Sequence, residues 1–332
     1  PGILKQYGYT NIQIGTPYYV DALKVNLIEG FEIVNNQSFD LQLQSVFNTV
    51  LGNSTSTHFI NTLIERVHKR LLHIFFIQEM QNPVKVANNP KVGMTDEDRV
   101  DQIISSLEQA DSPVFIFAHL MDTHGPDFGS SVQDSTSDTS DDKSWDKEQY
   151  KDAILRFDNH LERIYTHLKQ TGSLNNTILV IYTDHGYRYT VNHRIPVIFH
   201  FPKHEYAGSL KNNVQILDIP VTLMDYLSIP SPTWMTGTSL LDGEPPADRE
   251  IISIVSGSPK KEAPPFFQIK IVQFVICHKY YQLNVQTNKW SSKDLAGHTA
   301  QCDEEQVPSD EVVRQKILDY LEKFDYDITS LQ

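Results

Sequence analysis

The sequence is poor in cysteine, in clustered positive charge and in long apolar runs, and each shortage excludes a class of protein. It has 332 residues and 2 cysteines, too few for a disulfide-built scaffold. Lys and Arg number 28 against 42 Asp and Glu, which gives a net charge of −14. Without a basic cluster we expect no nucleic-acid partner. No run of about 18 apolar residues occurs, so we expect no membrane span within this sequence.

What remains is the composition of a globular protein with a large core, 39% hydrophobic and 21% charged. The length predicts one large domain, or one domain with a small appendage. The sequence begins at Pro1 without a methionine, at a segment that is predicted to be helical. We therefore expect a fragment or a processed product. Cys277 and Cys302 are either two thiols or one disulfide, and the sequence leaves both alternatives open.

Nearly all-apolar strands alternate with amphipathic helices along the first three quarters of the chain. Strands are predicted at residues 10–14, 114–118, 178–182 and 196–201. Helices are predicted at residues 1–7, 58–76, 96–109, 146–169 and 218–227. This alternation predicts an α/β domain over residues 1–249, in which helices cover both faces of a mostly parallel sheet. A Ser-, Thr- and Asp-rich segment, residues 127–143, is predicted to be a surface loop.

The last part of the chain has a different pattern. Residues 268–285 are predicted to form two strands with a turn near His278, and residues 309–324 a terminal amphipathic helix. We therefore expect residues 250–332 to form a small α+β subdomain.

Two predicted strands end in loops that contain histidine: "HLMDTHGP" at residues 119–126 and "TDHG" at residues 183–186. A further histidine, His193, lies eight residues after His185. In open α/β sheets, ligands bind at the carboxyl ends of the strands. Asp and neutral His are ligands for Zn²⁺ or Mn²⁺, and Asp also suits Ca²⁺. A single Asp-His-Gly is more often a turn, but the repeated pattern favours a functional site.

Six motifs, in order, resemble the sulfatase-like branch of the alkaline phosphatase superfamily, which includes sulfatases and phosphoglycerol and phosphoethanolamine transferases. The resemblance covers residues 2–245. The motifs are "GILKQYGYTNIQIG" (2–15), "EGFEIV" (29–34), "FIFAHLMDTHGP" (115–126), "VIYTDHG" (180–186), "HRIPVIFHFP" (193–202), and "VQILDIPVTLMDYLSIPSP" with "GTSLL" (214–241).

The resemblance implies a role for each matching residue. Asp184 and His185 would bind a divalent metal (Zn, Mn or Ca), and His124 and His193 would be catalytic residues at the oxygens of a phosphate- or sulfate-ester substrate. A metal and imidazolium donors stabilise the charge that develops on these oxygens during ester cleavage. Relatives of this kind work outside the cytoplasm, often tethered by N-terminal membrane helices, so we expect an extracytoplasmic location, periplasmic, secreted or on an outer membrane face.

The chain departs from the family in two places. In relatives, the first acidic metal ligands and the nucleophile precede the helix that here begins at residue 2. We therefore expect this chain to carry half of an active site, with the rest supplied by an upstream segment or a separate N-terminal fragment. In addition, "GTPYYV" (15–20) stands where sulfatases carry Gly-Lys-x-His, which favours the phosphotransferase or phosphodiesterase type over an ordinary sulfatase.

Two hypotheses follow. In the first, the chain is part of a metal-dependent hydrolase or transferase that acts on sulfate or phosphate esters through a covalent intermediate. In the second, it is a non-catalytic binding module that keeps the sulfatase-like fold. Because the chain lacks the expected nucleophile, the sequence does not decide whether it is an enzyme by itself.

Overall fold

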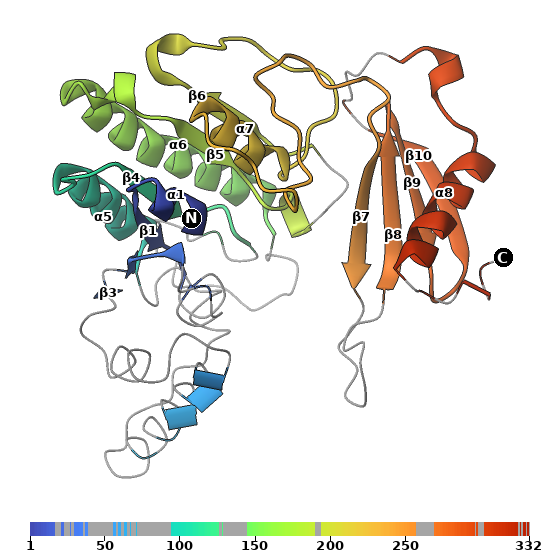
Figure 1. The fold of residues 1–332 in the computed structure, drawn as a ribbon, viewed down its shortest axis with the longest axis horizontal. Coiled ribbons are helices and arrows are strands. Elements are labelled where there is room, and N and C mark those ends of the chain that lie inside the picture. The colour runs from blue at the N-terminus through green and yellow to red at the C-terminus, as the bar shows by residue number, and fades with distance from the viewer. Residues whose placement is uncertain are drawn as a thin grey trace. The chain divides into compact units, whose positions relative to one another are not determined.

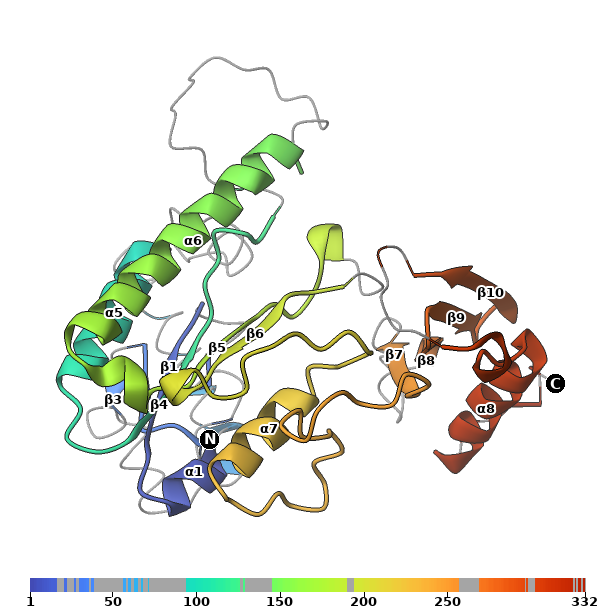
Figure 2. The ribbon, with the colours of Figure 1, turned by 90° about the horizontal axis from the view of Figure 1, so that it is seen from above.

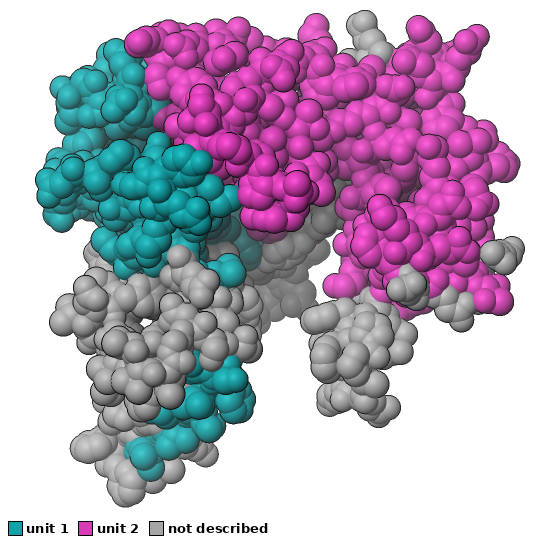
Figure 3. Space-filling model, viewed as in Figure 1, with its two compact units in different colours: residues 1–177 teal, residues 178–332 magenta. Residues whose placement is uncertain are grey.

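A computed structural model of the chain describes two compact units, residues 1–177 (unit 1) and residues 178–332 (unit 2), which Figure 3 shows in different colours. The described residues are 1–16, 21–22, 27, 30–35, 37–38, 56–57, 59–60, 63–64, 67, 71, 94–125, 128, 145–189, 194–256, 269–295, 297, 302–324, 326, 328–329 and 331. The predicted helix at 58–76 and loop at 127–143 therefore lie largely outside them, and so does His193.

Unit 1 is built on a sheet with the strand order β3-β2-β1-β4. The strands are β1 (Thr10–Ile14), β2 (Ile33–Val34), β3 (Gln37–Ser38) and β4 (Val114–Ala118). β1 pairs in parallel with β2 and with β4, from Thr10 opposite Val114 to Ile14 opposite Ala118, and only β3 is antiparallel. Parallel strands place the chain segments that follow β1, β2 and β4 at one edge of the sheet.

One face of this sheet is covered by two helices, α5 (Asp96–Glu108) and α6 (Lys147–Gln170), which lie side by side in Figures 1 and 2. Ile12 and Ile14 of β1 pack with Val100 of α5 and with Ile164 and Leu168 of α6 in one apolar cluster. The opposite sheet face packs Phe115 and Phe117 against another cluster, Ala22, Phe31 and Val34. The short helix α1 (Gly2–Gln6) precedes β1, and a 3-10 helix, η3 (Ser173–Asn176), follows α6.

Both covering helices begin at a residue whose side chain satisfies their first backbone N–H groups. Thr95 precedes α5 and forms a capping box with Asp98. Asp146 precedes α6, and its carboxylate accepts the N–H groups of Glu148 and Gln149. Caps of this kind each stabilise a helix by about 1 kcal/mol.

Unit 2 begins with two antiparallel strands, β5 (Leu179–Tyr182) and β6 (Val197–His200), with Leu179 opposite His200 and Tyr182 opposite Val197. Short 3-10 helices follow each strand, η4 (Tyr187–Tyr189) and η5 (Pro202–His204), and α7 (Asp218–Tyr226) comes next. The pairing places the segment that leaves β5 beside the segment that enters β6.

The rest of unit 2 is an antiparallel sheet in the order β10-β9-β8-β7, with one helix packed on it. The elements are β7 (Ile251–Ser256), β8 (Ile269–Ile276), β9 (Lys279–Asn284), β10 (Lys289–Asp294), η6 (Glu304–Gln306) and α8 (Asp310–Lys323). Phe274 and Tyr281 of the sheet pack with Ile317 and Leu321 of α8 in one buried cluster. Cys277 and Cys302 form a disulfide.

The predicted α/β class and its mostly parallel sheet are confirmed. The predicted strands at β1, β4, β5 and β6 and the helices at α5, α6, α7 and α8 all form, within two residues of their expected ends. The sequence reasoning missed β2, β3, β7 and β10. The division into residues 1–249 and 250–332 stays a prediction. Among the described helices, none is long and apolar enough to cross a membrane.

Candidate functional site

The segment that leaves β5 turns sharply at Thr183–Gly186 and brings a carboxylate beside an imidazole. Asp184 Oδ1 lies 3.7 Å from His185 Nε2. The Thr183 hydroxyl donates a hydrogen bond of 3.0 Å to the His185 carbonyl, which holds the bend. The Asp184 side chain is 60% exposed, so its oxygens remain accessible to a ligand.

The ring of His185 is oriented by a contact with the backbone. Its Nδ1 lies 3.0 Å from the carbonyl oxygen of Gly186. Because a carbonyl oxygen only accepts, Nδ1 carries the proton and the neutral ring has its lone pair on Nε2. The separation of 3.7 Å between Nε2 and Asp184 Oδ1 lets one ion lie at the usual distance of about 2.1 Å from both. The distance is compatible with one shared ion, and a complete metal site would require further ligands besides this pair.

A groove of about 1150 Å³ opens at this pair, entirely within unit 2. Asp184, His185 and Arg194 line it together with β6, the segment 206–217 and the sheet residues Ile251, Ser253 and Val275. Arg194 donates from Nη1 to the carbonyl oxygen of Gly297 at 2.8 Å. The pKa of the Tyr182 phenol is raised, mainly because the phenol is buried and in addition because of the negative charge of Asp184.

In unit 1, the loop after β4 carries His124 and is fixed by the first residue of α5. The Asp96 carboxylate, which is buried, accepts the backbone N–H groups of Met121 and Asp122 at 2.7 and 2.6 Å. Arg99 pairs with Asp96 at 2.5 Å and reaches Thr16, beyond the end of β1, at 3.5 Å. The segments that follow β1 and β4 are thus both bonded to the first turn of α5.

The side chain of Asp122 faces the guanidinium of Arg156 and the imidazole of His160, both on α6. Its Oδ2 lies 3.3 Å from His160 Nε2 and 3.6 Å from Arg156 Nε. Burial first, and then the charge of Asp96, raise the pKa of Asp122, while Arg156 and His160 act in the opposite direction. The effect of burial on the pKa of Asp122 is larger than the opposite effect of these two side chains.

Tight packing follows immediately after His124. A Cβ on Gly125 would lie 2.5 Å from a ring carbon of Trp145 and 2.8 Å from a ring carbon of Phe128, so a side chain does not fit there. Phe128 packs against Trp145 and Tyr150, with ring centroids 5.8 and 5.2 Å apart, and its carbonyl accepts a hydrogen bond from Arg156. The backbone around His124 is therefore fixed on its N-terminal side by Asp96 and on its C-terminal side by the packing of Gly125 and Phe128.

Of the four residues predicted for the site, the structure brings Asp184 and His185 together. His124 belongs to unit 1, and His193 lies outside the described residues, so their convergence with this pair stays a prediction. Sequence reasoning missed Asp96, Asp122 and Arg194. Asp122 stands inside a motif that was recognised, but Asp96 was visible only as an acidic first-turn residue of a helix.

The two segments of the last motif are joined by Asp218, which also forms a buried ion pair with Arg249. Asp218, at the start of α7, accepts two hydrogen bonds of 2.7 Å from Arg249 and one of 2.9 Å from the N–H of Thr238. Gly237 lies so close to α7 that an added Cβ would be 1.9 Å from the carbonyl oxygen of Leu217. These motif residues therefore stabilise the wall of the groove.

Comparison with known proteins identifies the family of the chain. The sulfatase family matches residues 1–229 of the chain. The N-acetylglucosamine-6-O-sulfatase of Bacteroides thetaiotaomicron is 29% identical over a stretch that covers 32% of this chain and 23% of that enzyme. The "extracellular sulfatase SULF-1 homolog" of Drosophila melanogaster is 29% identical over 24% of this chain and 8% of that protein. The chain thus spans less than a quarter of these curated relatives.

Solved structures show the same fold over most of the chain. A protein in the alkaline phosphatase superfamily from Vibrio parahaemolyticus gives a TM-score of 0.55 at 15% identity and covers 94% of this chain and 63% of its own. The lipoteichoic acid synthase LtaP from Listeria monocytogenes gives 0.54 at 14% identity and covers 98% and 72%. The fold is therefore alkaline phosphatase-like, and the chain belongs to the sulfatase family.

Proposed function

We propose that this chain carries part of a metal-dependent site that hydrolyses or transfers a sulfate or phosphate ester. The observation that carries the proposal is the Asp184–His185 pair, 3.7 Å apart at the end of a strand and open to a groove. The pair lies in the part of the chain that matches the sulfatase family. A bound Zn²⁺, Mn²⁺ or Ca²⁺ would supply Lewis-acid stabilisation of the ester oxygens.

Each residue has a distinct task in this proposal. Asp184 supplies a carboxylate ligand, and His185 supplies Nε2 while Gly186 fixes its ring. His124 and His193 contact the non-bridging oxygens of the ester, and one of them protonates the leaving oxygen. Two protein ligands are fewer than the three of a catalytic zinc site, so the proposal requires further ligands besides this pair. The expected upstream segment with the nucleophile stays a prediction.

The proposed substrate is a sulfate or a phosphate ester. The name of the bacterial relative supports a sulfate ester, because that protein is an N-acetylglucosamine-6-O-sulfatase. The residues "GTPYYV" support a phosphate ester, because they lack the lysine and histidine that sulfatases carry there. Both branches rely on the same metal and oxyanion chemistry.

A non-catalytic binding module with this fold is the second candidate. In the part of the chain that the structure describes, no group of three or more His, Cys, Asp or Glu side chains is placed to hold a metal. Such a module would bind the ester without turning it over.

We also propose an extracytoplasmic location. The Cys277–Cys302 disulfide supports it, because such bonds persist in oxidising compartments. One relative carries the word "extracellular" in its name.

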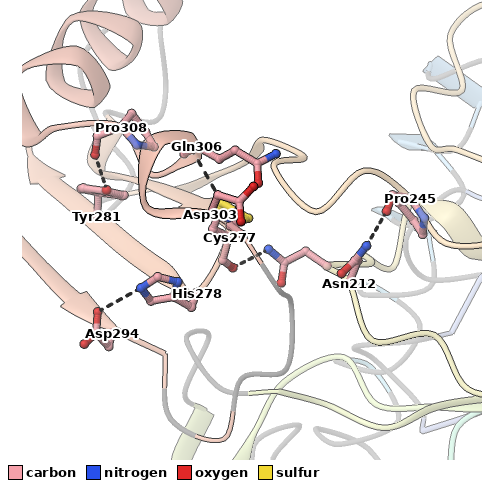
Figure 4. The surroundings of a disulfide bond; sticks show 11 residues. Asn212, Pro245, Cys277, His278, Tyr281, Asp294, Asp303, Gln306 and Pro308 are labelled. Atoms are coloured by element: carbon pink, nitrogen blue, oxygen red, sulfur yellow. Dashed lines mark hydrogen bonds and ion pairs between the residues drawn. A yellow bond between two sulfur atoms is a disulfide. The ribbon is translucent and has the colours of Figure 1, made fainter.

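The test measures binding and hydrolysis of esters by the purified chain with added Zn²⁺, Mn²⁺ or Ca²⁺. The esters are p-nitrophenyl sulfate, p-nitrophenyl phosphate and bis-p-nitrophenyl phosphate. Asp184→Asn removes the proposed ligand. Asp294→Asn is the matched control, because Asp294 also lies beside a histidine, 3.9 Å from Nε2 of His278 (Figure 4).

Because the proposal gives this chain only part of the site, we expect one of the esters to bind in a metal-dependent way, with binding weakened about tenfold or more in Asp184→Asn and kept in Asp294→Asn. Turnover in addition would show that a nucleophile is supplied. Binding of the esters that needs no metal and survives in Asp184→Asn would support the binding module. A chain that neither turns over nor binds any of the three esters would contradict both candidates.

A further inference from the structure

The groove is larger than one ester group requires. Its volume of about 1150 Å³ exceeds the 300–1,000 Å³ that pockets for small-molecule ligands usually have. The Asp184–His185 pair is part of its lining, and the C-terminal sheet contributes Ile251, Ser253 and Val275. A substrate that reacts at the pair therefore has room for a neighbouring chemical unit in the same groove.

Arg194 is the side chain best placed to recognise that unit. Tyr182 pairs with Val197, so the segment that enters β6 runs beside the one in which Asp184 leaves β5. Arg194 and Asp184 both line the groove. Residue Arg194 is exposed, and one of its five N–H donors is fixed by the Gly297 carbonyl. With the other described residues it forms no further hydrogen bond or ion pair, so the remaining donors can bind a ligand.

The charges of the groove favour an anion at Arg194. The charged side chains that line it are Asp184, Arg194, Lys211 and Glu244, and the imidazole of His185 lies beside them. Glu244 accepts a hydrogen bond from the backbone N–H of Lys211, and in the proposed function Asp184 binds the metal. Arg194 then has no carboxylate partner within the described groove. A planar guanidinium suits sulfate, phosphate and carboxylate oxygens better than an ammonium group does.

We infer that this groove binds a second anionic group of the same substrate, on the unit next to the reacting ester, and that Arg194 is the residue that recognises it. The group is a sulfate, a phosphate or a carboxylate. The apolar walls around it, among them Ile195, Ile251 and Val275, suit the C–H faces of a sugar or polyol unit. This inference rests on the proposed function, since it places the reacting ester at Asp184 and His185.

The test compares ligands that have one anionic group with ligands that have two, by isothermal titration calorimetry on the full chain. One pair of probes is an N-acetylglucosamine disaccharide with one sulfate and the same disaccharide with a second sulfate on the neighbouring sugar. The other pair is glycerol phosphate and its phosphodiester-linked dimer. The variants are Arg194→Gln and Arg194→Lys. Arg163→Gln is the control, because it removes an equal charge from a surface arginine of α6 that pairs with Asp101.

We expect the member with two anionic groups in one probe pair to bind about tenfold more tightly, the ratio that a charge-assisted hydrogen bond gives. The pair that shows this preference identifies the sulfated or the phosphorylated class. Arg194→Gln should reduce the preference to less than about twofold, Arg194→Lys should keep part of it, and Arg163→Gln should keep all of it. A preference that survives in Arg194→Gln, or no preference and no binding in the unaltered chain, would overturn the inference.

The metal content of the same samples distinguishes a failure of this inference from a failure of the proposed function. If the chain holds a metal through Asp184 and shows no preference for the second anion, the inference is wrong and the proposed function stands. If the preference depends on Arg194 but no metal binds, the subsite is real and the metal-dependent function is wrong.

Discussion

The backbone N–H of Asp122 donates a hydrogen bond of 2.6 Å to the buried carboxylate of Asp96, twenty-six residues earlier in the chain. The same carboxylate accepts the N–H of Met121 and pairs with Arg99. The first residue of α5 thereby fixes the loop in which His124 lies. The position of His124 thus depends on the Asp96 carboxylate, which does not itself contact the substrate in our proposal.

Loss of this carboxylate should be costly for stability. Asp96→Ala leaves the buried Arg99 and two backbone N–H groups without their partner, so we expect the free energy of unfolding to fall by about 3–5 kcal/mol. Asp96→Asn keeps one acceptor oxygen and should cost less. Urea unfolding measures both. Asp101→Asn, an exposed α5 residue, is the control, and a loss below about 1 kcal/mol in Asp96→Ala would refute the anchoring role.

The raised pKa of Asp122 predicts a particular pH dependence. The folded state binds more protons than the unfolded state between the ordinary and the raised pKa of this carboxyl group. Its contribution to the free energy of unfolding must therefore fall as the pH rises through that interval. In urea titrations across pH 3–7, roughly the range in which carboxyl groups titrate, the unaltered chain should lose stability relative to Asp122→Asn. A relative gain would mean that Arg156 and His160 outweigh burial.

The Asp218–Arg249 pair should be a second point of high sensitivity. Asp218 is fully buried and the Arg249 side chain is 11% exposed. Asp218→Ala leaves the buried guanidinium of Arg249 without its carboxylate partner, so we expect the free energy of unfolding to fall by about 3–5 kcal/mol. Arg249→Lys keeps the charge but loses the bidentate geometry and should cost less. Chemical denaturation of the two variants provides the comparison, and equal losses would show that the geometry of the pair does not contribute.

Reduction of the Cys277–Cys302 disulfide should destabilise the C-terminal sheet. The bond joins residues 25 apart in sequence, and loop-closure entropy assigns about 3–4 kcal/mol to a loop of that size. The bond also lies beside a contact of the groove wall, since Asn213 donates to the Cys277 carbonyl at 2.9 Å (Figure 4). We expect thermal unfolding to shift to lower temperature in the Cys277→Ser/Cys302→Ser double variant. An unchanged midpoint would contradict the prediction.

Local patterns were enough to predict the elements that frame the site. β4 and β5 are short apolar runs, and α6 repeats its apolar residues with helical period. β10 was missed because "KWSSKD" contains a single large apolar residue and gives no alternating pattern. β7 was missed although "IISIVS" is apolar, because a short run of this kind does not by itself distinguish a strand from a helix.

The side-chain contacts of the site were only partly predictable. Asp184 and His185 are neighbours in sequence, so their proximity required only a bend at Gly186. Arg194 and Gly297 are 103 residues apart, and the sequence around neither residue predicts their hydrogen bond. The same holds for Asp96 and the N–H groups of the β4 loop. Contacts of this range depend on the tertiary fold, which residue spacing alone does not give.

We propose that Asp184 and His185 bind a divalent metal, and the metal stoichiometry of the chain tests this proposal. Elemental analysis after dialysis against Zn²⁺, Mn²⁺ or Ca²⁺ would compare the unaltered chain with Asp184→Asn/His185→Gln. The control is Asp294→Asn/His278→Gln, which changes a pair with the same residue types at 3.9 Å. The account predicts one ion per chain, lost in the first variant and kept in the control. Retention of the ion in the first variant, or its absence from the unaltered chain, would contradict it.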